Sequence, residues 1–292
     1  MLMDARPVYD KITALAKKDA EKLKRSHVTL AAILTANDET SKVYVGMKRK
    51  DCASCGIRSE VYEAYKAENE KDYEKKVLAL IKKLNERDDV HGILVQLPLS
   101  PKLDEERIFE TLEPKKDVDS LTPYNLGKIM RGEYDNDSLL PCTPKGIMRL
   151  LDYYKIGIEG KDAVIIGRSF LVGEPLRKLL QDRDATATCV HSKTRDISEI
   201  VRTADIVVSA VGRPPELYGN GFRLTKGMLK RGAVVIGVGV KKDKGKMFFD
   251  VDVDGIKGRV SFVTPNIGGV GLMTRACLIE NTVIAAKNYG QV

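Results

Sequence analysis

The sequence has no tryptophan, and aromatic residues make up only 6% of its 292 residues. Its five cysteines are an odd number spread along the chain, which argues against a disulfide framework and for reduced thiols. Cys52 and Cys55 form a C-x-x-C pair, but no second pair and no histidine cluster accompanies them. A structural zinc site needs four such ligands, so we expect no metal.

Long apolar runs are also missing. No window approaches the roughly eighteen apolar residues of a membrane span, and the charged N-terminal segment is unlike a secretory signal. We therefore expect a cytoplasmic protein that does not bind membranes. The formal net charge of +8 suits nucleic acid, but it suits an anionic substrate or cofactor equally well. Charge alone does not choose between them.

The hydrophobic pattern alternates between strand and helix in both halves of the chain, which predicts an α/β fold. In the first half we expect an amphipathic helix at the start, strands at 28–34, 58–62 and 90–95, and helices at 41–55 and 68–87. A loop at 117–125 follows, and then a helix with Thr143 as its N-cap and Pro144 as its first residue.

The second half has the pattern of a doubly wound, Rossmann-type nucleotide-binding domain. Its expected strands are 162–166, 185–190, 206–211 and 233–238, with a helix in each connection and a last helix at 273–287. We predict an N-terminal α/β substrate domain at 1–140 and an NADP domain at 141–268. The segment 269–292 would form a C-terminal helix that packs on the first domain.

A glycine loop joins the first strand of the second half to the helix that follows. Gly167, Arg168, Ser169 and Gly173 occupy the place where an open parallel sheet binds a dinucleotide. The spacing is not G-x-G-x-x-G, and a turn that needs glycine for steric reasons alone is the alternative.

The end of the following strand distinguishes NAD from NADP. NAD sites commonly place a carboxylate there, whereas this chain has none before Asp196. The hydrogen-bond donors available for a 2′-phosphate instead are Arg168, Ser192, Lys193 and Arg195. We predict NADP, and a solvated basic loop is the alternative.

Tyr44 and Lys48 stand four residues apart in a predicted helix and so share one face of it. The Y-x-x-x-K pair of short-chain dehydrogenases follows the nucleotide loop, whereas this pair precedes it. Gln96 closes an apolar strand, at the edge where α/β sites are built, and its carbonyl suits a lysine ammonium. These three residues could act on one ligand, or Tyr44 and Lys48 could simply be solvated.

Two carboxylates, Asp117 and Asp119, lie in a loop after a predicted helix. One of them could accept hydrogen bonds from an amino-substituted heterocycle. A metal site is the alternative, but no third ligand stands nearby. We interpret His91 as a structural histidine.

Taken together, these motifs resemble the bifunctional methylenetetrahydrofolate dehydrogenase/cyclohydrolase family over nearly the whole chain. The motifs are, in order, S-x-x-Y-x-x-x-K from Ser41, VHGILVQLPL from Val90, DVD from Asp117, GRS from Gly167, HSKT from His191 and TP-x-x-GGVG-x-MT from Thr264. Departures from the family pattern include Ser120, where glycine is usual, and Asn266, Ile267 and Leu272 in the last motif.

The resemblance implies hydride transfer from 5,10-methylenetetrahydrofolate to NADP and hydrolysis of the methenyl product to 10-formyltetrahydrofolate. It also implies a homodimer whose folate cleft lies between the two domains. By resemblance Tyr44 stacks on the folate, Asp119 anchors the pterin, and Gly268 and Gly269 belong to the loop that lines the cleft. Lys48, held by Gln96, would move the protons in the hydrolysis.

Two alternatives stay open at this point. An oxidoreductase similar to shikimate dehydrogenase would share the two-domain plan, and Lys48 could serve as its base. A basic protein that binds nucleic acid without catalysis would also carry the charge. Its basic runs lack interleaved aromatic residues, so we expect no nucleic-acid binding.

Overall fold

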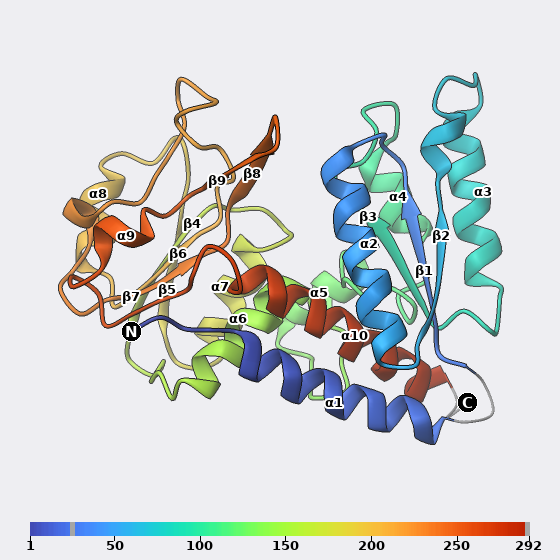
Figure 1. Cartoon of the computed structure of the whole chain (residues 1–292), viewed down its shortest axis with the longest axis horizontal. Helices are drawn as coiled ribbons and strands as arrows, with labels where there is room; N and C mark the ends of the chain where they lie inside the picture. The colour runs from blue at the N-terminus through green and yellow to red at the C-terminus, as the bar shows by residue number, and fades with distance from the viewer. Residues whose placement is uncertain (24–26, 290–292) are drawn as a thin grey trace. The chain divides into compact units, whose positions relative to one another are not determined.

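The computed structural model describes residues 1–23 and 27–289, which form two compact units. Unit 1 contains Met1–Tyr9 and Thr143–Thr274, and unit 2 contains Asp10–Cys142 and Arg275–Val292. Both the first helix, α1 (Arg6–Lys22), and the last, α10 (Val270–Tyr289), contribute residues to each unit. Figure 1 shows these elements along the chain.

Unit 2 is built on a parallel sheet of three strands in the order β2-β1-β3. The strands are β1 (Thr29–Leu34), β2 (Arg58–Tyr62) and β3 (Gly92–Gln96). Besides parts of α1 and α10, its helices are α2 (Glu39–Ser54), the 3₁₀ turn η1 (Ala64–Ala67), α3 (Tyr73–Asn85), α4 (Glu105–Thr111) and α5 (Pro123–Arg131).

One hydrophobic cluster of unit 2 lies on one face of the central strand β1. Leu30, Ala32 and Leu34 alternate along β1, and they pack in one cluster with apolar residues of α1, α2 and α10. All six residues of β1 are buried, so both faces of the strand are covered, as a parallel sheet requires. The chain therefore forms β1 from a continuous apolar run.

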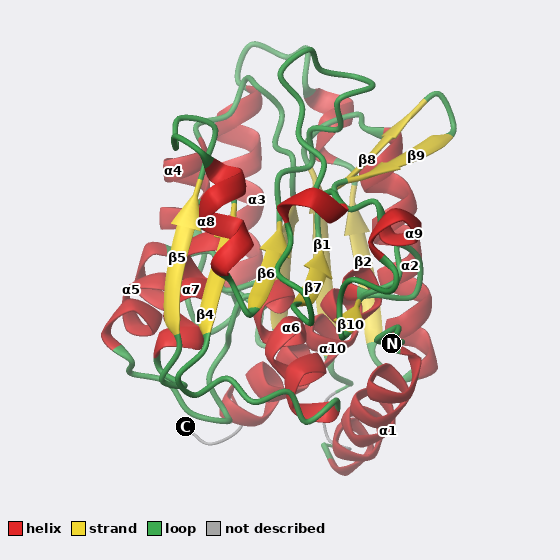
Figure 2. Ribbon diagram, turned by 90° about the vertical axis from the view of Figure 1, so that its left-hand side faces the viewer, coloured by secondary structure: helices red, strands yellow, loops and turns green. Residues whose placement is uncertain are grey.

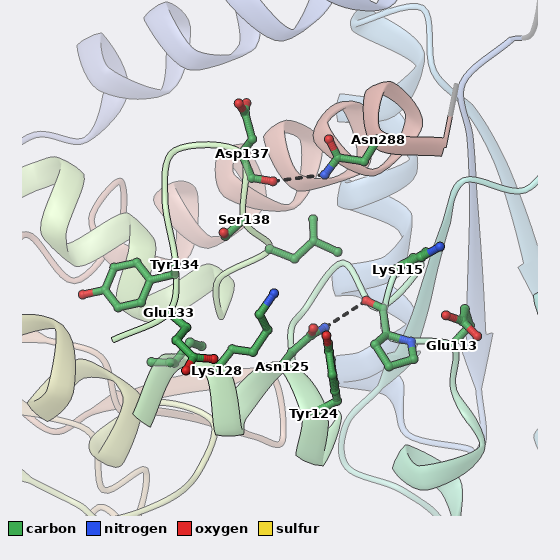
Figure 3. A pocket seen from close by; sticks show the side chains of 13 residues that line it. Glu113, Lys115, Tyr124, Asn125, Lys128, Glu133, Tyr134, Asp137, Ser138 and Asn288 are labelled. Carbon is green, nitrogen blue, oxygen red and sulfur yellow. Dashed lines mark hydrogen bonds between the residues drawn. The ribbon is translucent and has the colours of Figure 1, made fainter. Parts of the chain in front are cut away.

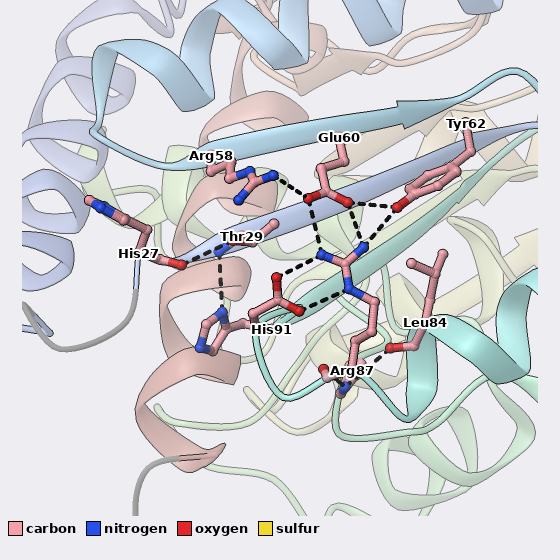
Figure 4. A network of polar contacts seen from close by, with 10 residues as sticks. His27, Thr29, Arg58, Glu60, Tyr62, Leu84, Arg87 and His91 are labelled. Carbon is pink, nitrogen blue, oxygen red and sulfur yellow. Dashed lines mark hydrogen bonds and ion pairs between the residues drawn. The ribbon is translucent and has the colours of Figure 1, made fainter.

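The edge strand β2 is held by an ion-pair network around Arg87 (Figure 4). The Arg87 guanidinium donates to both carboxylate oxygens of Glu60 at 2.8 and 3.1 Å and to the Tyr62 hydroxyl at 2.9 Å. It also pairs with Asp89 at 2.7 Å. The segment after α3 is thereby tied to β2.

Unit 1 contains a parallel sheet of five strands in the order β10-β7-β6-β4-β5. The strands are β4 (Asp162–Ile166), β5 (Thr186–Val190), β6 (Ile206–Ser209), β7 (Val234–Gly237) and β10 (Phe262–Val263). Its other elements are α6 (Cys142–Tyr153), α7 (Gly173–Gln181), α8 (Ile197–Thr203), η2 (Lys226–Met228), α9 (Val253–Ile256) and the antiparallel hairpin of β8 (Val240–Asp243) and β9 (Lys246–Phe249). The order reverses at β4, which is the crossover of a doubly wound sheet, and Figure 2 shows the five strands and the hairpin.

Several expected boundaries differ from the structure. Helix α3 begins at Tyr73 rather than at 68, because the charged residues before it offer no apolar face. The connection between β6 and β7 holds the short turn η2 in place of the expected helix, and Pro214 and Pro215 disfavour a helix at its start. Helix α6 starts at Cys142, so Thr143 lies in its first turn instead of capping it.

The sequence pattern missed several elements, among them α5, the β8–β9 hairpin, α9 and the short strand β10. The expected loop at 117–125 runs into α5, which starts at Pro123 with Thr122 as N-cap, accepting from the Asn125 N–H at 3.3 Å. The β8–β9 hairpin turns at Lys244 and Gly245, both with positive φ. Its strands are rich in charge, which hid their alternation.

Candidate active site in unit 2 and nucleotide loop in unit 1

Helix α2 carries Tyr44 and Lys48. It begins after Asp38, whose carboxylate accepts from the Ser41 N–H at 2.7 Å and from the Ser41 hydroxyl at 2.8 Å. Lys48 is buried, with 8% exposed, and Tyr44 lies half-buried one turn earlier. The expected shared helix face is therefore present.

Lys48 meets Gln96 as the sequence pattern indicated. The Lys48 Nζ donates to Gln96 Oε1 at 2.9 Å, and Gln96 Nε2 donates to the Leu97 carbonyl at 2.7 Å, which turns the amide oxygen toward the lysine. Gln96 pairs in register with Leu34, the last residue of β1, and α2 follows β1. The pair thus stands at the carboxyl edge of the sheet, where α/β proteins bind ligands.

The two carboxylates of the D-V-D motif have different surroundings. Asp117 is 1% exposed and accepts from the Thr122 N–H at 2.8 Å and from Asn125 Nδ2 at 3.0 Å. Burial raises the pKa of the Asp117 carboxyl, and these hydrogen bonds oppose that rise. Asp119 is half-buried, so of the two it is the one placed to meet a ligand.

The buried thiol of Cys142 lies near both Asp119 and Lys48. Burial and then the charge of Asp119 raise the pKa of this thiol well above its usual range, while the charge of Lys48 lowers it. Both charged groups therefore act on the same sulfur atom. Asp119 and Lys48 therefore both lie near this thiol, and Gln96 joins them through its hydrogen bond with Lys48. We call Lys48, Gln96 and Asp119 the lysine cluster.

Ser120 explains why glycine is usual after the D-V-D motif. Its φ is 57°, in the left-handed region that favours glycine. The serine is buried, its N–H donates to the Asp117 carbonyl at 3.1 Å, and its hydroxyl donates to the Leu139 carbonyl at 2.9 Å. The added hydroxyl is thus satisfied in a conformation that costs a side chain some strain.

The nucleotide loop of unit 1 follows β4. Because Ile166 of β4 pairs with Val190 of β5, Arg168 and Ser192 both stand two residues beyond the same rung of the sheet. The Gly167 N–H donates to the Val190 carbonyl at 2.8 Å, which joins the two loops. Arg168 and Ser192 are exposed at this edge, available to an anionic ligand.

The glycines of this loop have a steric reason of their own. A Cβ at Gly173 would lie 2.2 Å from the Gly167 carbonyl oxygen, and one at Gly167, whose φ is +129°, would lie 2.6 Å from the Ala210 carbonyl oxygen. The alternative of a steric turn therefore accounts for both glycines. It does not account for the exposed donors at the loop, among them Ser169.

Gly268 and Gly269 belong to unit 1, whereas Tyr44 and the lysine cluster belong to unit 2. Gly268 has a φ of +81°, and its carbonyl accepts from the Ala5 N–H at 2.9 Å. A Cβ at Gly269 would lie 2.3 Å from the Pro265 carbonyl oxygen. The adjoining Ile267 is 82% exposed. Here too the backbone requires glycine.

Three side chains outside the lysine cluster are buried. His91 is buried, and its Nδ1 accepts from the Thr29 N–H at 3.2 Å, as expected of a structural histidine. Cys52 and Cys55 are buried, and burial raises the pKa of the Cys52 thiol to about 12. Sequence reasoning missed Cys142, because a lone cysteine before a helix gives no signal of what it contacts.

A separate cavity of about 440 Å³ opens in unit 2 beside α5 (Figure 3). Tyr124, Lys128 and Tyr134 line it with residues of the α5–α6 connection, and Asn288 donates to the Asp137 carbonyl at 3.1 Å. The described residues that line it include none of the lysine cluster. The two hydrogen bonds drawn in Figure 3, from Asn125 to the Pro114 carbonyl and from Asn288 to the Asp137 carbonyl, both lie within the protein.

Comparison with known proteins identifies the family. The model of the tetrahydrofolate dehydrogenase/cyclohydrolase catalytic domain matches residues 3–119, and that of the NAD(P)-binding domain of the same enzymes matches residues 141–290. The chain belongs to this family. The expected resemblance is confirmed, and so is the two-domain α/β fold with its NAD(P)-binding parallel sheet and a C-terminal helix that contacts α1.

Individual members of the tetrahydrofolate dehydrogenase/cyclohydrolase family align over almost the whole chain. The bifunctional protein FolD of Pyrobaculum neutrophilum is 48% identical over 279 residues, covering 92% of this chain and 89% of the relative. The crystal structure of the bifunctional FolD enzyme of Campylobacter jejuni aligns with a TM-score of 0.89 at 40% identity, covering 99% of both chains. The enzyme of Trypanosoma brucei, solved with NADP and an inhibitor, aligns with a TM-score of 0.89 at 34% identity, covering 100% of this chain and 99% of that one.

Family membership decides between the alternatives left open by the sequence. It selects the folate reactions over the oxidation of a hydroxy acid and over a basic protein without catalysis. No helix among the described residues has the length and apolar character needed to cross a membrane. The same portion of the chain holds no cluster of three or more potential metal ligands.

Proposed function

We propose that the lysine cluster carries out the folate chemistry of this bifunctional enzyme and that the exposed donors of unit 1 select NADP. The protein is a methylenetetrahydrofolate dehydrogenase and methenyltetrahydrofolate cyclohydrolase of one-carbon metabolism. The observation that carries the assignment of the cluster is the 2.9 Å hydrogen bond between the buried Lys48 and Gln96 at the carboxyl edge of the sheet.

The dehydrogenase step depends mainly on positioning. The carbon that loses hydride lies between two nitrogens whose lone pairs stabilise the developing cation, so little acid–base assistance is needed. We assign Tyr44 to stacking on the folate and Asp119 to accepting hydrogen bonds from the pterin. Gly268 and Gly269 shape the loop that contacts the substrate.

The cofactor supplies the hydride acceptor when bound, and the residues at its expected site fit a dinucleotide. Gly167, Ser169 and Gly173 bring the chain from β4 into α7, whose nine residues place an N-terminus with a positive dipole end at the loop. Arg168 and Ser192 can bind a 2′-phosphate, and Asp196 stands four residues beyond Ser192. This arrangement supports NADP over NAD.

The cyclohydrolase step needs protons moved between water and a ring nitrogen. The Lys48 Nζ is the group suited to this task, because Gln96 accepts one of its hydrogens and fixes its direction. The methenyl cation is hydrolysed to 10-formyltetrahydrofolate when water adds to the former bridge carbon. Lys48 and Gln96 act as a unit, and loss of either disturbs the proton path.

The test of the lysine is Lys48→Met, with Lys50→Met as a matched control from an exposed position on the same helix. We expect Lys48→Met to lose methenyl hydrolysis by at least a hundredfold while NADP binding persists. Hydrolysis should be unchanged in Lys50→Met. An unchanged hydrolysis rate in Lys48→Met would refute the assignment.

The test of cofactor choice is the double variant Arg168→Ala/Ser192→Ala. Removing both donors should weaken NADP at least tenfold more than NAD in equilibrium binding, because only NADP carries the 2′-phosphate. Lys161→Ala, at an exposed position just before β4, is the control and should change neither. Equal losses for the two cofactors would show that neither residue contacts that phosphate.

A homodimer and a cytoplasmic location complete the proposal. The reduced state of the five cysteines suits a reducing compartment. Light scattering of the purified protein should give twice the chain mass of 32.4 kDa, and a monomer at micromolar concentration would contradict the dimer.

A further inference from the structure

Arg275 of α10 forms hydrogen bonds with helix α2 on the turn that carries Lys48. Its Nε and Nη2 donate to the two carboxylate oxygens of Asp51 at 2.6 and 2.7 Å. Its Nη1 donates to the Met47 Sδ at 3.5 Å. Met47 directly precedes Lys48 and Asp51 follows it by three residues, so the guanidinium contacts α2 on both sides of the lysine.

The ion pair is well placed to fix orientation. The Asp51 side chain is 8% exposed and that of Arg275 is 20% exposed, so solvent screens the pair little. A bidentate guanidinium–carboxylate pair sets both the distance and the rotation of its partners. Helix α2 also has Gly46 directly before Met47, which lowers its intrinsic helical stability, so this turn depends on tertiary contacts.

The same helix holds the loop that carries Asp119. Asn281, six residues beyond Arg275, donates from its Nδ2 to the carbonyls of Val118 and Leu140, each at 2.8 Å. It also reaches the Cys142 Sγ at 3.6 Å. The segments that carry Lys48 and Asp119 are thus both held by side chains of α10.

We propose that Asp51 and Arg275 are positioning residues that hold Lys48 at hydrogen-bond distance from Gln96 for the cyclohydrolase step. This inference rests on the proposed role of Lys48. Neither residue needs to touch the substrate. Their effect is on the proton-transfer geometry, which a displacement of about 1 Å is enough to impair.

The measurable consequence is a change in the ratio of the two activities. Hydride transfer relies on substrate position, whereas hydrolysis also relies on the Lys48 Nζ. Loss of the ion pair between Asp51 and Arg275 should therefore lower the kcat of the cyclohydrolase more than that of the dehydrogenase, with little change in KM for the folate. A loss of folded protein would lower both activities equally and leave their ratio unchanged.

The test compares Asp51→Asn with Asp19→Asn in the full chain. The control removes a second ion pair of α10, that between Lys287 and Asp19 of α1 at 2.6 Å, together with the exposed Lys22–Asp19 pair within α1. We expect the cyclohydrolase-to-dehydrogenase ratio of kcat values to fall about tenfold in Asp51→Asn and to stay within twofold of wild type in Asp19→Asn. Circular dichroism and a urea titration check that both variants fold.

Arg275→Lys keeps the positive charge but loses the bidentate geometry of the guanidinium. A fall of about threefold in its cyclohydrolase-to-dehydrogenase ratio of kcat values supports the inference. This second variant also decides the matter if Asp51→Asn does not fold. A wild-type ratio in the folded variants would overturn the positioning role.

Lys48→Met, measured in parallel, separates the two proposals. If it keeps its hydrolysis, the assignment of Lys48 fails. If it loses hydrolysis while Asp51→Asn and Arg275→Lys keep the wild-type ratio, only the positioning inference fails.

Discussion

Replacing the buried Lys116 by methionine should destabilise unit 2 strongly. Lys116 is fully buried, and its Nζ donates to the carbonyls of Leu84, Asn85 and Arg87 at 3.2, 2.8 and 2.6 Å. The Leu84 and Asn85 carbonyls belong to the last turn of α3, and Arg87 lies two residues beyond its end, where a helix needs donors from outside its own ladder. Burial lowers the pKa of the ammonium, which shows that burying it has a cost.

The magnitude follows from these opposing contributions. Hydrogen bonds from a charged donor contribute roughly 1.5–3 kcal/mol each, and several kcal/mol of ammonium desolvation offset part of their sum. Methionine has a similar volume but cannot donate to the three carbonyls, of which Leu84 keeps a donor in the Arg87 N–H at 3.4 Å and Arg87 keeps one in the Val90 N–H at 3.2 Å. We therefore expect the free energy of unfolding to fall by about 2–4 kcal/mol, which corresponds to a Tm lower by about 5–15 °C.

The assay is a urea titration followed by circular dichroism, with Lys115→Met as the matched control. Lys115 is the preceding residue and is exposed, so its replacement should change stability by less than about 0.5 kcal/mol. If Lys116→Met were as stable as Lys115→Met, the interpretation of Lys116 as the cap of α3 would be refuted.

Two further predictions concern the loop of Asp119 and the edge strand β2. Asn281→Leu should raise the KM for folate at least threefold in both activities. The reason is that the carbonyls of Val118 and Leu140 lose their donor, so the loop that carries Asp119 is held less firmly. An unchanged KM in steady-state assays would contradict this. Glu60→Gln should lower the free energy of unfolding at pH 7 by about 1 kcal/mol. Hydrogen bonding from Arg87 lowers the pKa of the Glu60 carboxyl below its ordinary 4.5, so the wild-type advantage is complete above that pH and is lost as the pH falls through the lower folded-state value. Urea midpoints of both proteins between pH 3 and 7 measure it, and a difference that did not shrink on acidification would contradict the role of the ion pair.

The sequence predicted the elements whose apolar pattern is strong. The strands β1 and β3 and the strand pair β4 and β5 are continuous or alternating apolar runs, and the ends of β3, β4 and β5 place Gln96, Arg168 and Ser192 at the sheet edges. The pairing of Lys48 with Gln96 also followed from local reasoning. Helix α2 follows β1, and β1 pairs with β3, so the helix face and the strand end lie at the same edge of the sheet.

The rest depends on contacts between residues far apart in the chain, which no local pattern encodes. Arg275 and Asp51 are separated by 224 positions, and Asn281 and Val118 by 163. Which of Asp117 and Asp119 stays accessible is likewise decided by Thr122 and Asn125 of the next helix. The sequence did not predict the hairpin β8–β9, because its charged side chains hide the alternation of apolar and polar residues that is typical of a strand.

The most direct test of the account follows the purified protein with 5,10-methylenetetrahydrofolate and either NADP or NAD, recording reduced cofactor and methenyl product separately. The account predicts that reduced NADP accumulates with little methenyl product, since the cyclohydrolase consumes it, and that Lys48→Met makes the methenyl product accumulate. Reduction with neither cofactor, or no methenyl accumulation in a Lys48→Met variant that still reduces NADP, would contradict it.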